Sequence, residues 1–332
     1  MKKLKISVIG TGHLGNIHAK LWKNNEYAEL VGIYDTDLSR AETVSKEYGV
    51  KAFSSLEETC AESDAVTIAA PTLAHHAIAM ECIERGIHCL IEKPITDSYS
   101  QAVEVIKLAK AKNALVQVGH VERFNPALAA LKGYIKDPAF IEAHRLSQFK
   151  PRAIDVSVIH DLMIHDIDIV LWMVGSEIER IDANGVALIT NTPDIANARL
   201  TFKNGAVANL TASRISANPM RKLRVFQPNA YISIDFGKPD VEVFRMTDAD
   251  SPEKITPIGD NSVPATMLGT IDAGTKNKAI MFEKPAIPQI NAIAEEQTAF
   301  ANSIINNQPI AVSAEEAAEA LRIAELIAEQ IG

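Results

Sequence analysis

The sequence predicts an α/β protein with two domains. The N-terminal domain is expected to hold a parallel sheet, and an α+β domain with a large, open-faced, mainly antiparallel sheet is expected to follow it. Three observations predict this. The chain of 332 residues is too long for a single ordinary domain core. Short apolar runs alternate with helical stretches up to Gly119, and longer alternating runs follow. A glycine-rich turn directly follows the first apolar run. We therefore expect domains at 1–121 and 122–332.

The elements of the first domain follow from its periodicity. Strands are predicted for the β-rich runs 5–9, 29–34, 65–69, 87–91 and 114–118. Helices are predicted between them, over 13–24, 39–48, 73–86 and 98–112. Because strands alternate with helices, right-handed βαβ units in a parallel sheet are expected.

The second domain changes pattern. Helices are expected over 126–136, 160–174, 289–306 and 313–331, the last starting at a Ser313/Glu316 capping box. Alternating polar and apolar residues predict antiparallel strands at 139–149, 178–190, 195–203, 205–214, 222–227, 230–236 and 240–246. The stretch 247–288 is rich in Pro, Gly, Asp and Thr, and is expected to be loop.

Composition excludes several classes of protein. The net charge of −9 disfavours nonspecific binding to nucleic acid or to an anionic membrane. No apolar stretch approaches the ~18 residues of a membrane span. The three cysteines lack CxxC spacing, which argues against a disulfide framework or a zinc site. We expect a cytoplasmic protein, and we read the short apolar run at the start as a strand rather than a signal peptide.

The glycine-rich turn is a dinucleotide-binding pattern. Gly10, Gly12 and Gly15 form GxGxxG, with His13 and Leu14 inside it, after a predicted strand and at the start of a predicted helix. Glycines let the backbone approach a pyrophosphate at the helix N-terminus. The alternatives are a turn needed only for packing, or FAD, which usually requires a longer chain.

Asp35 ends the next predicted strand, twenty residues after Gly15. A carboxylate there can accept hydrogen bonds from both adenosine ribose hydroxyls and repels a 2′-phosphate, which favours NAD over NADP. Arg40 could reach a phosphate and weaken that preference. If the turn served packing alone, Asp35 would be a solvated helix cap.

Glu92, Lys93 and Pro94 directly follow a predicted strand. Ligands of open α/β sheets bind beyond the carboxyl ends of the strands, so Lys93 is well placed to reach a substrate. A solvated charge pair is an equally good explanation from spacing alone. A second EKP, at 283–285, follows no comparable strand, and we assign it no role.

Asp161, His165 and Asp168 share one face of the apolar stretch 160–174. A carboxylate next to an imidazole sets its tautomer and basicity, which suits a general base for an alcohol proton. The alternative is a core histidine near acidic residues at a helix start. A metal site of the kind found in hydrolases is a further alternative, but His160 lies about 100° around the helix from Asp161, so we predict no metal.

Taken together, the chain resembles the glucose–fructose oxidoreductase/inositol dehydrogenase/MocA family. The resemblance rests on GTGHLG, APTLAHH, EKP, VGHVERFNP and the DxxxH from Asp161 to His165, in that order over nearly the whole chain. It implies an N-terminal Rossmann domain that binds NAD, and a homodimer or homotetramer assembled through the open sheet.

The resemblance also implies roles for individual residues. Lys93, Asp161 and His165 would be catalytic. The cofactor cleft would be lined by Pro71, Thr72, His75, Glu92 and Lys93. The substrate would be bound by Arg123, Asn125, Arg152, Asp161 and His165. One departure concerns the loop before the DxxxH motif, where many members carry a glycine pair and this chain has Val158, Ile159 and His160.

Within the family, the stretches VERFNPA and DVSVIHDLMIHDIDIVLWMVG are most similar to members that oxidise the 3-hydroxyl of UDP-N-acetylglucosamine. Such a product is passed to a partner sugar aminotransferase. A diphosphate substrate needs cations, for which the candidates are Lys150, Arg152, Arg214, Arg221 and Arg224.

The expected chemistry is oxidation of a secondary hydroxyl of a sugar or sugar nucleotide. His165 would take the hydroxyl proton, Asp161 would orient His165, and Lys93 would donate to the reacting oxygen. Lys93 and His165 could exchange roles. Alternatives are an inositol or free-sugar dehydrogenase, a non-catalytic NAD-binding protein and a metal-dependent hydrolase.

Overall fold

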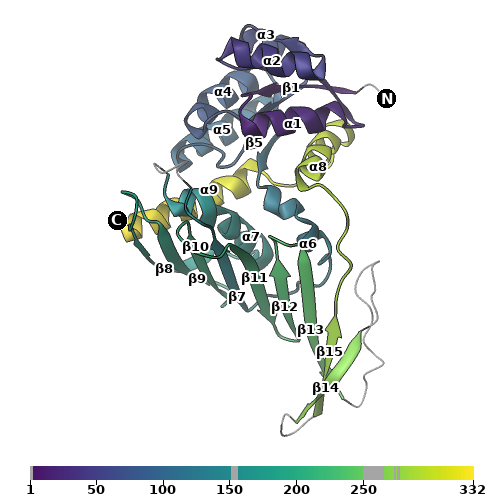
Figure 1. The fold of residues 1–332 in the computed structure, drawn as a ribbon, viewed down its shortest axis with the longest axis vertical. Helices are drawn as coiled ribbons and strands as arrows, with labels where there is room; N and C mark the ends of the chain where they lie inside the picture. Colours follow the sequence, from purple (N-terminus) through teal and green to yellow (C-terminus); the bar gives the residue numbers. More distant parts are fainter. Residues whose placement is uncertain (1–2, 151–155, 250–264, 273, 275–276) are drawn as a thin grey trace. The chain divides into compact units, whose positions relative to one another are not determined.

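The computed structural model describes residues 3–150, 156–249, 265–272, 274 and 277–332. The chain divides into two compact units (Figure 1). Unit 1 contains the residues up to Val121 together with Asn291–Glu325. Unit 2 contains Glu122–Ile290 and Leu326–Gly332. Within the described part of the chain, none of the helices is long and apolar enough to cross a membrane.

Unit 1 is built on a parallel sheet of six strands in the order β3-β2-β1-β4-β5-β6. The strands are β1 (Leu4–Ile9), β2 (Ala28–Tyr34), β3 (Lys51–Ala52), β4 (Ala65–Ile68), β5 (His88–Glu92) and β6 (Val116–Gly119). β4 and β6 are wholly buried, as expected for parallel strands covered on both faces. The order reverses between β1 and β4, which is where doubly wound sheets bind their ligands.

The helices of unit 1 are α1 (His13–Lys23), α2 (Leu38–Tyr48), α3 (Leu56–Glu62), α4 (Thr72–Glu84), α5 (Tyr99–Lys112), α8 (Ala292–Asn306) and most of α9 (Ala314–Ile331). Strand β3 and helix α3 were not predicted, because a two-residue strand and a seven-residue helix are too short to show periodicity. Helix α3 is nevertheless well capped, since Ser55 Oγ accepts the Glu58 N–H at 3.1 Å.

Helix α8 does not belong to the second unit, contrary to the expected division at 121/122. Phe300 and Ala301 lie in the buried core of unit 1 with Trp22 and Ala19 of α1. The two helices are therefore joined by apolar packing between residues nearly 280 positions apart. Sequence order alone does not reveal such a contact, which is why 291–325 was assigned to the wrong domain.

Unit 2 is built on a nine-stranded sheet in the order β14-β15-β13-β12-β11-β7-β10-β9-β8. The strands are β7 (Phe140–Leu146), β8 (Ile178–Val186), β9 (Ile195–Phe202), β10 (Val207–Ser213), β11 (Met220–Gln227), β12 (Ala230–Asp235), β13 (Asp240–Asp248), β14 (Thr266–Asp272) and β15 (Asn277–Glu283). All neighbouring pairs are antiparallel except β7 with β10. The fold class expected from the sequence is confirmed.

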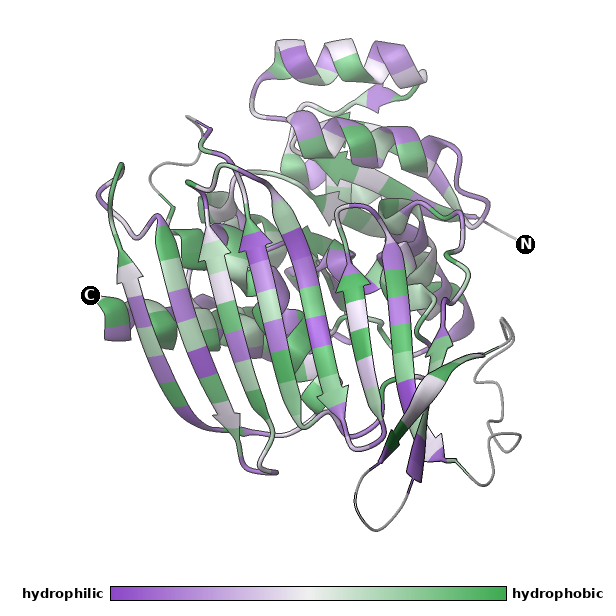
Figure 2. Cartoon of the chain, turned by 60° about the horizontal axis from the view of Figure 1, so that its bottom comes forward, coloured by the Kyte–Doolittle hydropathy of each residue, from purple (hydrophilic) through white to green (hydrophobic). Residues whose placement is uncertain are grey.

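One face of this sheet is covered and the other is open. Helix α7 (Ile164–Val174) contacts β7 and β10, and buried residues such as Ile141 and Leu210 point to that side. On the opposite face the described helices leave the strands uncovered (Figure 2). Strand residues there are only partly buried, as in the alternating pattern of β7.

Two expectations for unit 2 were wrong. The stretch 247–288 is not all loop, because β14 and β15 pair as a hairpin within it. β14 is exposed on both sides, so its residues show no alternation of buried and exposed positions, whereas β15 buries Ala279 and Met281. The helix expected over 126–136 is only the single turn α6 (Pro126–Ala129), preceded by the short 3₁₀ helix η1 (Val121–Phe124).

The packing of α8 yields a prediction about stability. Phe300→Ala removes a fully buried ring from the core of unit 1, so it should lower the free energy of unfolding by about 3–5 kcal/mol. The matched control is Leu38→Ala on α2, whose side chain is half exposed and should cost under about 0.5 kcal/mol. Urea unfolding measures both. Equal losses would show that α8 is not part of this core.

Candidate active site

Each of the three glycines in the turn after β1 is a glycine for a different physical reason. Gly10 has φ +88°, and a Cβ there would lie 2.7 Å from the backbone nitrogen of Ala70. A Cβ on Gly15 would lie 1.8 Å from the carbonyl oxygen of Gly10, so strand and helix approach closely only with glycine. Around Gly12, at the N-cap of α1, a Cβ would meet no protein atom within 4 Å. Gly12 is thus the position that is open to a ligand.

A pocket of about 460 Å³ lies over this turn. Its lining residues come from the turn, α1 and α2: Thr11, Gly12, His13, Asn16, Ile17, Lys20 and Arg40. The backbone N–H groups at the start of α1 have no acceptor within the helix, and the helix dipole favours a negative charge there. The pocket therefore fits a diphosphate, with Lys20 and Arg40 as additional cations.

Asp35 braces the turn. Its Oδ2 accepts hydrogen bonds from the backbone N–H and the hydroxyl of Thr11, both at 2.7 Å, and its Oδ1 accepts the Asp37 N–H at 2.9 Å. Burial by itself would raise the pKa of Asp35, but these hydrogen bonds and the charge of Arg40 hold the pKa below its ordinary value. Asp35 is thus an ionised acceptor bonded to Thr11, which lines the pocket.

The three hydrogen bonds that Asp35 already accepts limit how many ribose hydroxyls it can bind. A carboxylate offers about four lone-pair positions, so about one remains for a ribose hydroxyl. Contact with both hydroxyls, as the sequence suggested, would require Thr11 or Asp37 to release its bond.

The predicted residues after β4 and β5 lie at the same edge of the sheet. Pro71 is the N-cap of α4 and Thr72 is its first residue. The ring nitrogens of His75 lie 2.9 Å from the carbonyl oxygens of Ala70 and Pro94. His75 thereby connects the turn after β4 to the segment that carries Lys93, whose peptide bond to Pro94 is cis.

Glu92 has a partner that the sequence analysis missed. His18 Nε2 lies 2.7 Å from Glu92 Oε1, and His18 is fully buried on α1. The signal was present in the spacing, because His18 is three residues after Gly15 and thus on the same buried helix face. What the sequence could not give was the partner, 74 residues away.

In unit 2, the expected helix 160–174 begins with one turn of π-helix, η2 (Ile159–Met163), before α7. Asp161 lies within the π turn, and both Asp161 and His165 are half-buried. Such single turns are frequent at functional sites. Asp168, the third member of the predicted stripe, is fully buried instead.

Two buried arginines hold the helix that carries His165. Arg123 donates to both oxygens of Asp168, at 2.8 and 2.6 Å. Arg145 donates to both oxygens of Asp166, at 3.0 and 2.8 Å, and to Glu122 at 3.0 Å. Bidentate pairs of this kind fix geometry as well as charge.

The partners found for the predicted substrate residues are structural. Arg123 is occupied by Asp168, and Asn125 caps α6 by accepting the Ala127 N–H at 3.0 Å. Their role in substrate binding stays a prediction. Arg152 lies outside the described residues.

The other candidate cations differ in environment. Arg214 is nearly buried, 3.8 Å from Asp194. Arg221 lies 3.6 Å from Glu122 with its side chain 55% exposed, and Lys150 is exposed. Arg224 pairs with Glu142 at 3.3 Å on the open face of the sheet.

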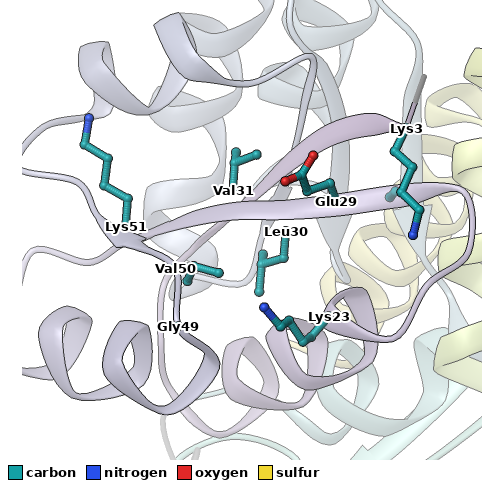
Figure 3. A pocket seen from close by; sticks show the side chains of 9 residues that line it. Lys3, Lys23, Glu29, Leu30, Val31, Gly49, Val50 and Lys51 are labelled. Carbon is teal, nitrogen blue, oxygen red and sulfur yellow. The ribbon is translucent and has the colours of Figure 1, made fainter.

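Unit 1 has a larger pocket of about 580 Å³ (Figure 3), and none of its lining residues belongs to the glycine turn. It is formed near the starts of β1 and β2, at the edge opposite the carboxyl ends of the strands. Two of its lysines are already used, since Lys3 donates to Asn25 O at 3.1 Å and Lys51 lies 2.7 Å from Glu58. Size alone does not make it the site.

A six-stranded Rossmann sheet, a glycine turn with an open pocket, and an ionised acid at the end of β2 define an NAD-binding oxidoreductase. Comparison with known families agrees. Residues 4–120 match the oxidoreductase family with an NAD-binding Rossmann fold, and residues 133–233 match the GFO/IDH/MocA C-terminal domain. The chain belongs to the GFO/IDH/MocA family, and its cofactor is NAD.

Individual relatives are similar over different lengths. The chain is 36% identical over 311 residues to UDP-N-acetylglucosamine 3-dehydrogenase of Acidithiobacillus ferrooxidans, covering 93% of this chain and 91% of the relative. The solved structure of that enzyme, GnnA, superposes with a TM-score of 0.87 at 32% identity, covering 100% and 98% of the two chains. The chain is 31% identical over 235 residues to scyllo-inositol 2-dehydrogenase (NAD(+)) of Bacillus subtilis, covering 64% and 68%.

The open space at Gly12 yields a test of the cofactor site. Gly12→Val should leave the free energy of unfolding within about 0.5 kcal/mol, because the new side chain meets no protein atom. It should weaken NAD binding at least tenfold, or about 1.4 kcal/mol, because the side chain occupies the space of the diphosphate. Calorimetric titration with NAD measures this. Unchanged affinity would place the diphosphate elsewhere.

Proposed function

We propose that this enzyme oxidises the 3-hydroxyl of UDP-N-acetylglucosamine to the 3-keto sugar nucleotide. The observation that carries the proposal is the similarity to UDP-N-acetylglucosamine 3-dehydrogenase, which extends over both units at 36% identity. In sequence, the inositol dehydrogenases align with only 52–65% of the chain. Substrate-binding residues lie on the second unit in this proposal, so similarity there bears on the substrate.

The proposed reaction gives a role to each of the three candidate catalytic residues. NAD, when bound, supplies the hydride acceptor. His165 takes the proton of the 3-hydroxyl, and Asp161 orients the imidazole. Lys93 donates a hydrogen bond to the reacting oxygen and stabilises negative charge as it develops. Exchange of the roles of Lys93 and His165 is the alternative within the same mechanism.

Recognition of the substrate requires cations for its diphosphate. Lys150, Arg152 and Arg221 are the candidates that we retain. Arg214 and Arg224 are less suited, because Arg214 is nearly buried beside Asp194 and Arg224 lies on the open sheet face. The second candidate function is oxidation of an inositol or free sugar, which the similarity to scyllo-inositol 2-dehydrogenase favours.

The open sheet face supports a homo-oligomer, a dimer or a tetramer. Phe140, Phe226, Tyr231, Phe244 and Phe282 form a continuous row across five neighbouring strands, with successive ring centroids 4.9–5.7 Å apart. Packed aromatic rings on an uncovered face are typical of an interface. We propose that a second copy of this chain covers them.

We further propose that the enzyme works in the cytoplasm and passes its keto product to a sugar aminotransferase. Cys60, Cys82 and Cys89 are all buried thiols, which suits a reducing compartment. A ketone at C3 is the substrate class that an aminotransferase uses.

The substrate assignment is tested by reduction of NAD in the presence of candidate substrates. Purified enzyme with UDP-N-acetylglucosamine should give NADH absorbance, increased when an aminotransferase and glutamate remove the ketone. Parallel reactions with myo-inositol, scyllo-inositol and free N-acetylglucosamine should stay at background. Signal with an inositol alone would contradict the nucleotide sugar and support the second candidate.

The role of Lys93 has a matched control in the chain. Lys93→Met should lower kcat at least 100-fold while leaving the Kd of NAD within about threefold, because Lys93 is proposed to act in the transition state. Lys284→Met changes the same residue in the second EKP, where Lys284 pairs with Asp240 at 3.1 Å, and should leave kcat unchanged. Near-normal turnover of Lys93→Met would remove Lys93 from the mechanism.

The interface is tested by placing a charge in the aromatic row. Phe244→Asp should shift the oligomer to a monomer in light scattering, because an unpaired carboxylate would be buried between subunits. The control Leu38→Asp, on an exposed position of α2, should leave the mass unchanged. An oligomer that survives Phe244→Asp would place the interface elsewhere.

A further inference from the structure

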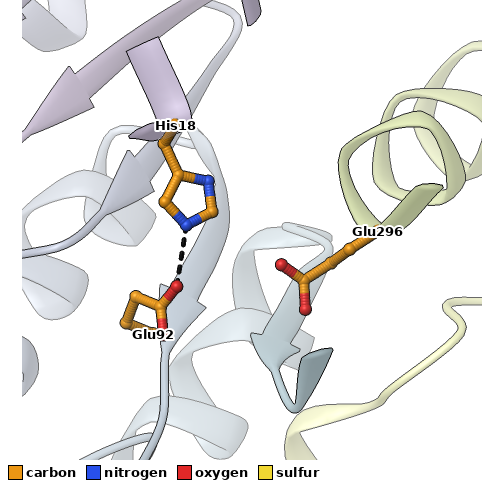
Figure 4. A group of neighbouring side chains, drawn as sticks. All are labelled: His18, Glu92 and Glu296. Carbon is orange, nitrogen blue, oxygen red and sulfur yellow. Dashed lines mark hydrogen bonds and ion pairs between the residues drawn. The ribbon is translucent and has the colours of Figure 1, made fainter. Parts of the chain in front are cut away.

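Unit 1 contains a cluster of His18, Glu92 and Glu296, in which Glu92 is the first residue of the EKP segment (Figure 4). One nitrogen or oxygen of each lies within 4.8 Å of the others. The three residues come from α1, β5 and α8. Glu296 is fully buried and its carboxyl group points toward the other two side chains. Nothing in the proposed mechanism uses Glu296, and burying a carboxyl group without a purpose is costly.

The hydrogen bonds fix the tautomer of His18. Gln297 Nε2 lies 3.1 Å from both the backbone oxygen and Nδ1 of His18. Because the carbonyl oxygen can only accept, the amide nitrogen of Gln297 is the atom that faces it. His18 Nδ1 is then an acceptor, so Nε2 carries the hydrogen and donates to Glu92 at 2.7 Å. Glu92 is therefore the acceptor in this hydrogen bond, which favours its ionised form.

Glu296 differs from Glu92 in what surrounds it. Both of its oxygens lack a hydrogen-bond partner within the described residues, as do the side-chain oxygens of Gln117 and Gln297. All four are acceptors, so the region is short of a donor. A proton on Glu296 converts one acceptor into a donor and also avoids two negative charges in one buried site.

We propose that Glu296 is a positioning residue. It keeps one proton in the His18–Glu92–Glu296 cluster and, through Glu92, holds the backbone of Lys93 in place. Glu92 Oε2 accepts the backbone N–H of Lys93 at 3.3 Å. Gly119 permits this placement, since a Cβ there would lie 3.1 Å from Glu92 Oε2. The link to catalysis rests on the proposed function of Lys93.

The charges around the cluster agree with this assignment. Burial and the negative charge of Glu92 raise the pKa of Glu296 well above its ordinary value. Burial opposes ionisation of Glu92 too, but the hydrogen bond from His18 lowers its pKa. The titratable groups near Glu296 are His18 and Glu92, followed by Lys93. Strand β6 adds the uncharged amide of Gln117. The N-terminal dipole of α8 acts within its first turn, which ends before Glu296.

A metal ion is a poorer occupant of this cluster. Two ligands of one tetrahedral Zn²⁺, each about 2.0–2.1 Å from the metal, would stand about 3.3 Å apart. The 2.7 Å between His18 Nε2 and Glu92 Oε1 is instead the length of a hydrogen bond.

The proton on Glu296 is tested without substrate, so the result does not depend on the proposed function. Glu296 is protonated in the folded chain but ionised in the unfolded chain above its ordinary pKa, so its contribution to stability falls as pH rises. Glu296→Gln cannot ionise. The ratio of unfolding constants, wild type over variant, should therefore rise by up to tenfold per pH unit between pH 5 and pH 8. Glu295→Gln, at an exposed neighbour, should show no such trend.

Infrared spectra at pH 7 supply a second readout. Wild type should show the carbonyl stretch of a protonated carboxyl group, which Glu296→Gln abolishes and Glu295→Gln retains. A wild-type spectrum without this band, or a stability ratio that does not change with pH, would overturn the proposal. Stoichiometric metal in the purified enzyme that Glu296→Gln releases would overturn it as well.

The positioning role is tested by turnover. Glu296→Ala should lower kcat at least tenfold with the KM of NAD within twofold, and Glu296→Gln should restore kcat to within threefold of wild type. Full turnover of Glu296→Ala would end the positioning claim. Loss of turnover in Glu296→Gln as well would show that an ionisable group, not the neutral one proposed, is required.

Discussion

The close approach of Gly15 to Gly10 is the constraint on which the cofactor site depends. A Cβ on Gly15 would lie 1.8 Å from the Gly10 carbonyl oxygen, so only glycine lets α1 start directly against β1. That contact sets the rotation of α1. It turns Gly12 toward the open pocket and His18 toward the interior, where it meets Glu92. The close contact between Gly15 and Gly10 thus shapes the diphosphate site and also places His18 beside Glu92, next to Lys93.

Patterns among neighbouring residues predicted the secondary structure and the turn that those neighbouring residues determine. Period-two and period-3.6 patterns located the long strands and helices, and the glycine spacing located the cofactor turn. The sequence could not supply contacts between distant residues. Phe300 packing against α1, Glu296 near Glu92, and Arg145 between Glu122 and Asp166 all depend on the folded topology. The hairpin of β14 and β15 was missed for a different reason, because β14 is exposed on both sides and has no buried face that periodicity could reveal.

The candidate catalytic residues are supported by different kinds of structure in the two units. Lys93 follows a buried parallel strand and sits next to the His18–Glu92 bond. His165 lies just after a π turn, on a helix held by two bidentate arginine pairs. Both arrangements fix the backbone that carries a candidate acid–base group before substrate binds, as catalysis by positioned groups requires. Substrate choice is less constrained by the sequence, because it depends on how cations such as Lys150 and Arg221 are placed.

The central claim is that hydride leaves C3 of a nucleotide sugar for NAD. UDP-N-acetylglucosamine carrying deuterium at C3 tests it most directly, with the mass of the reduced cofactor as the measurement. We predict that the NADH formed contains the deuterium and that turnover is slower than with the unlabelled sugar. NADH without deuterium would show that the hydride comes from another carbon, and would contradict the account.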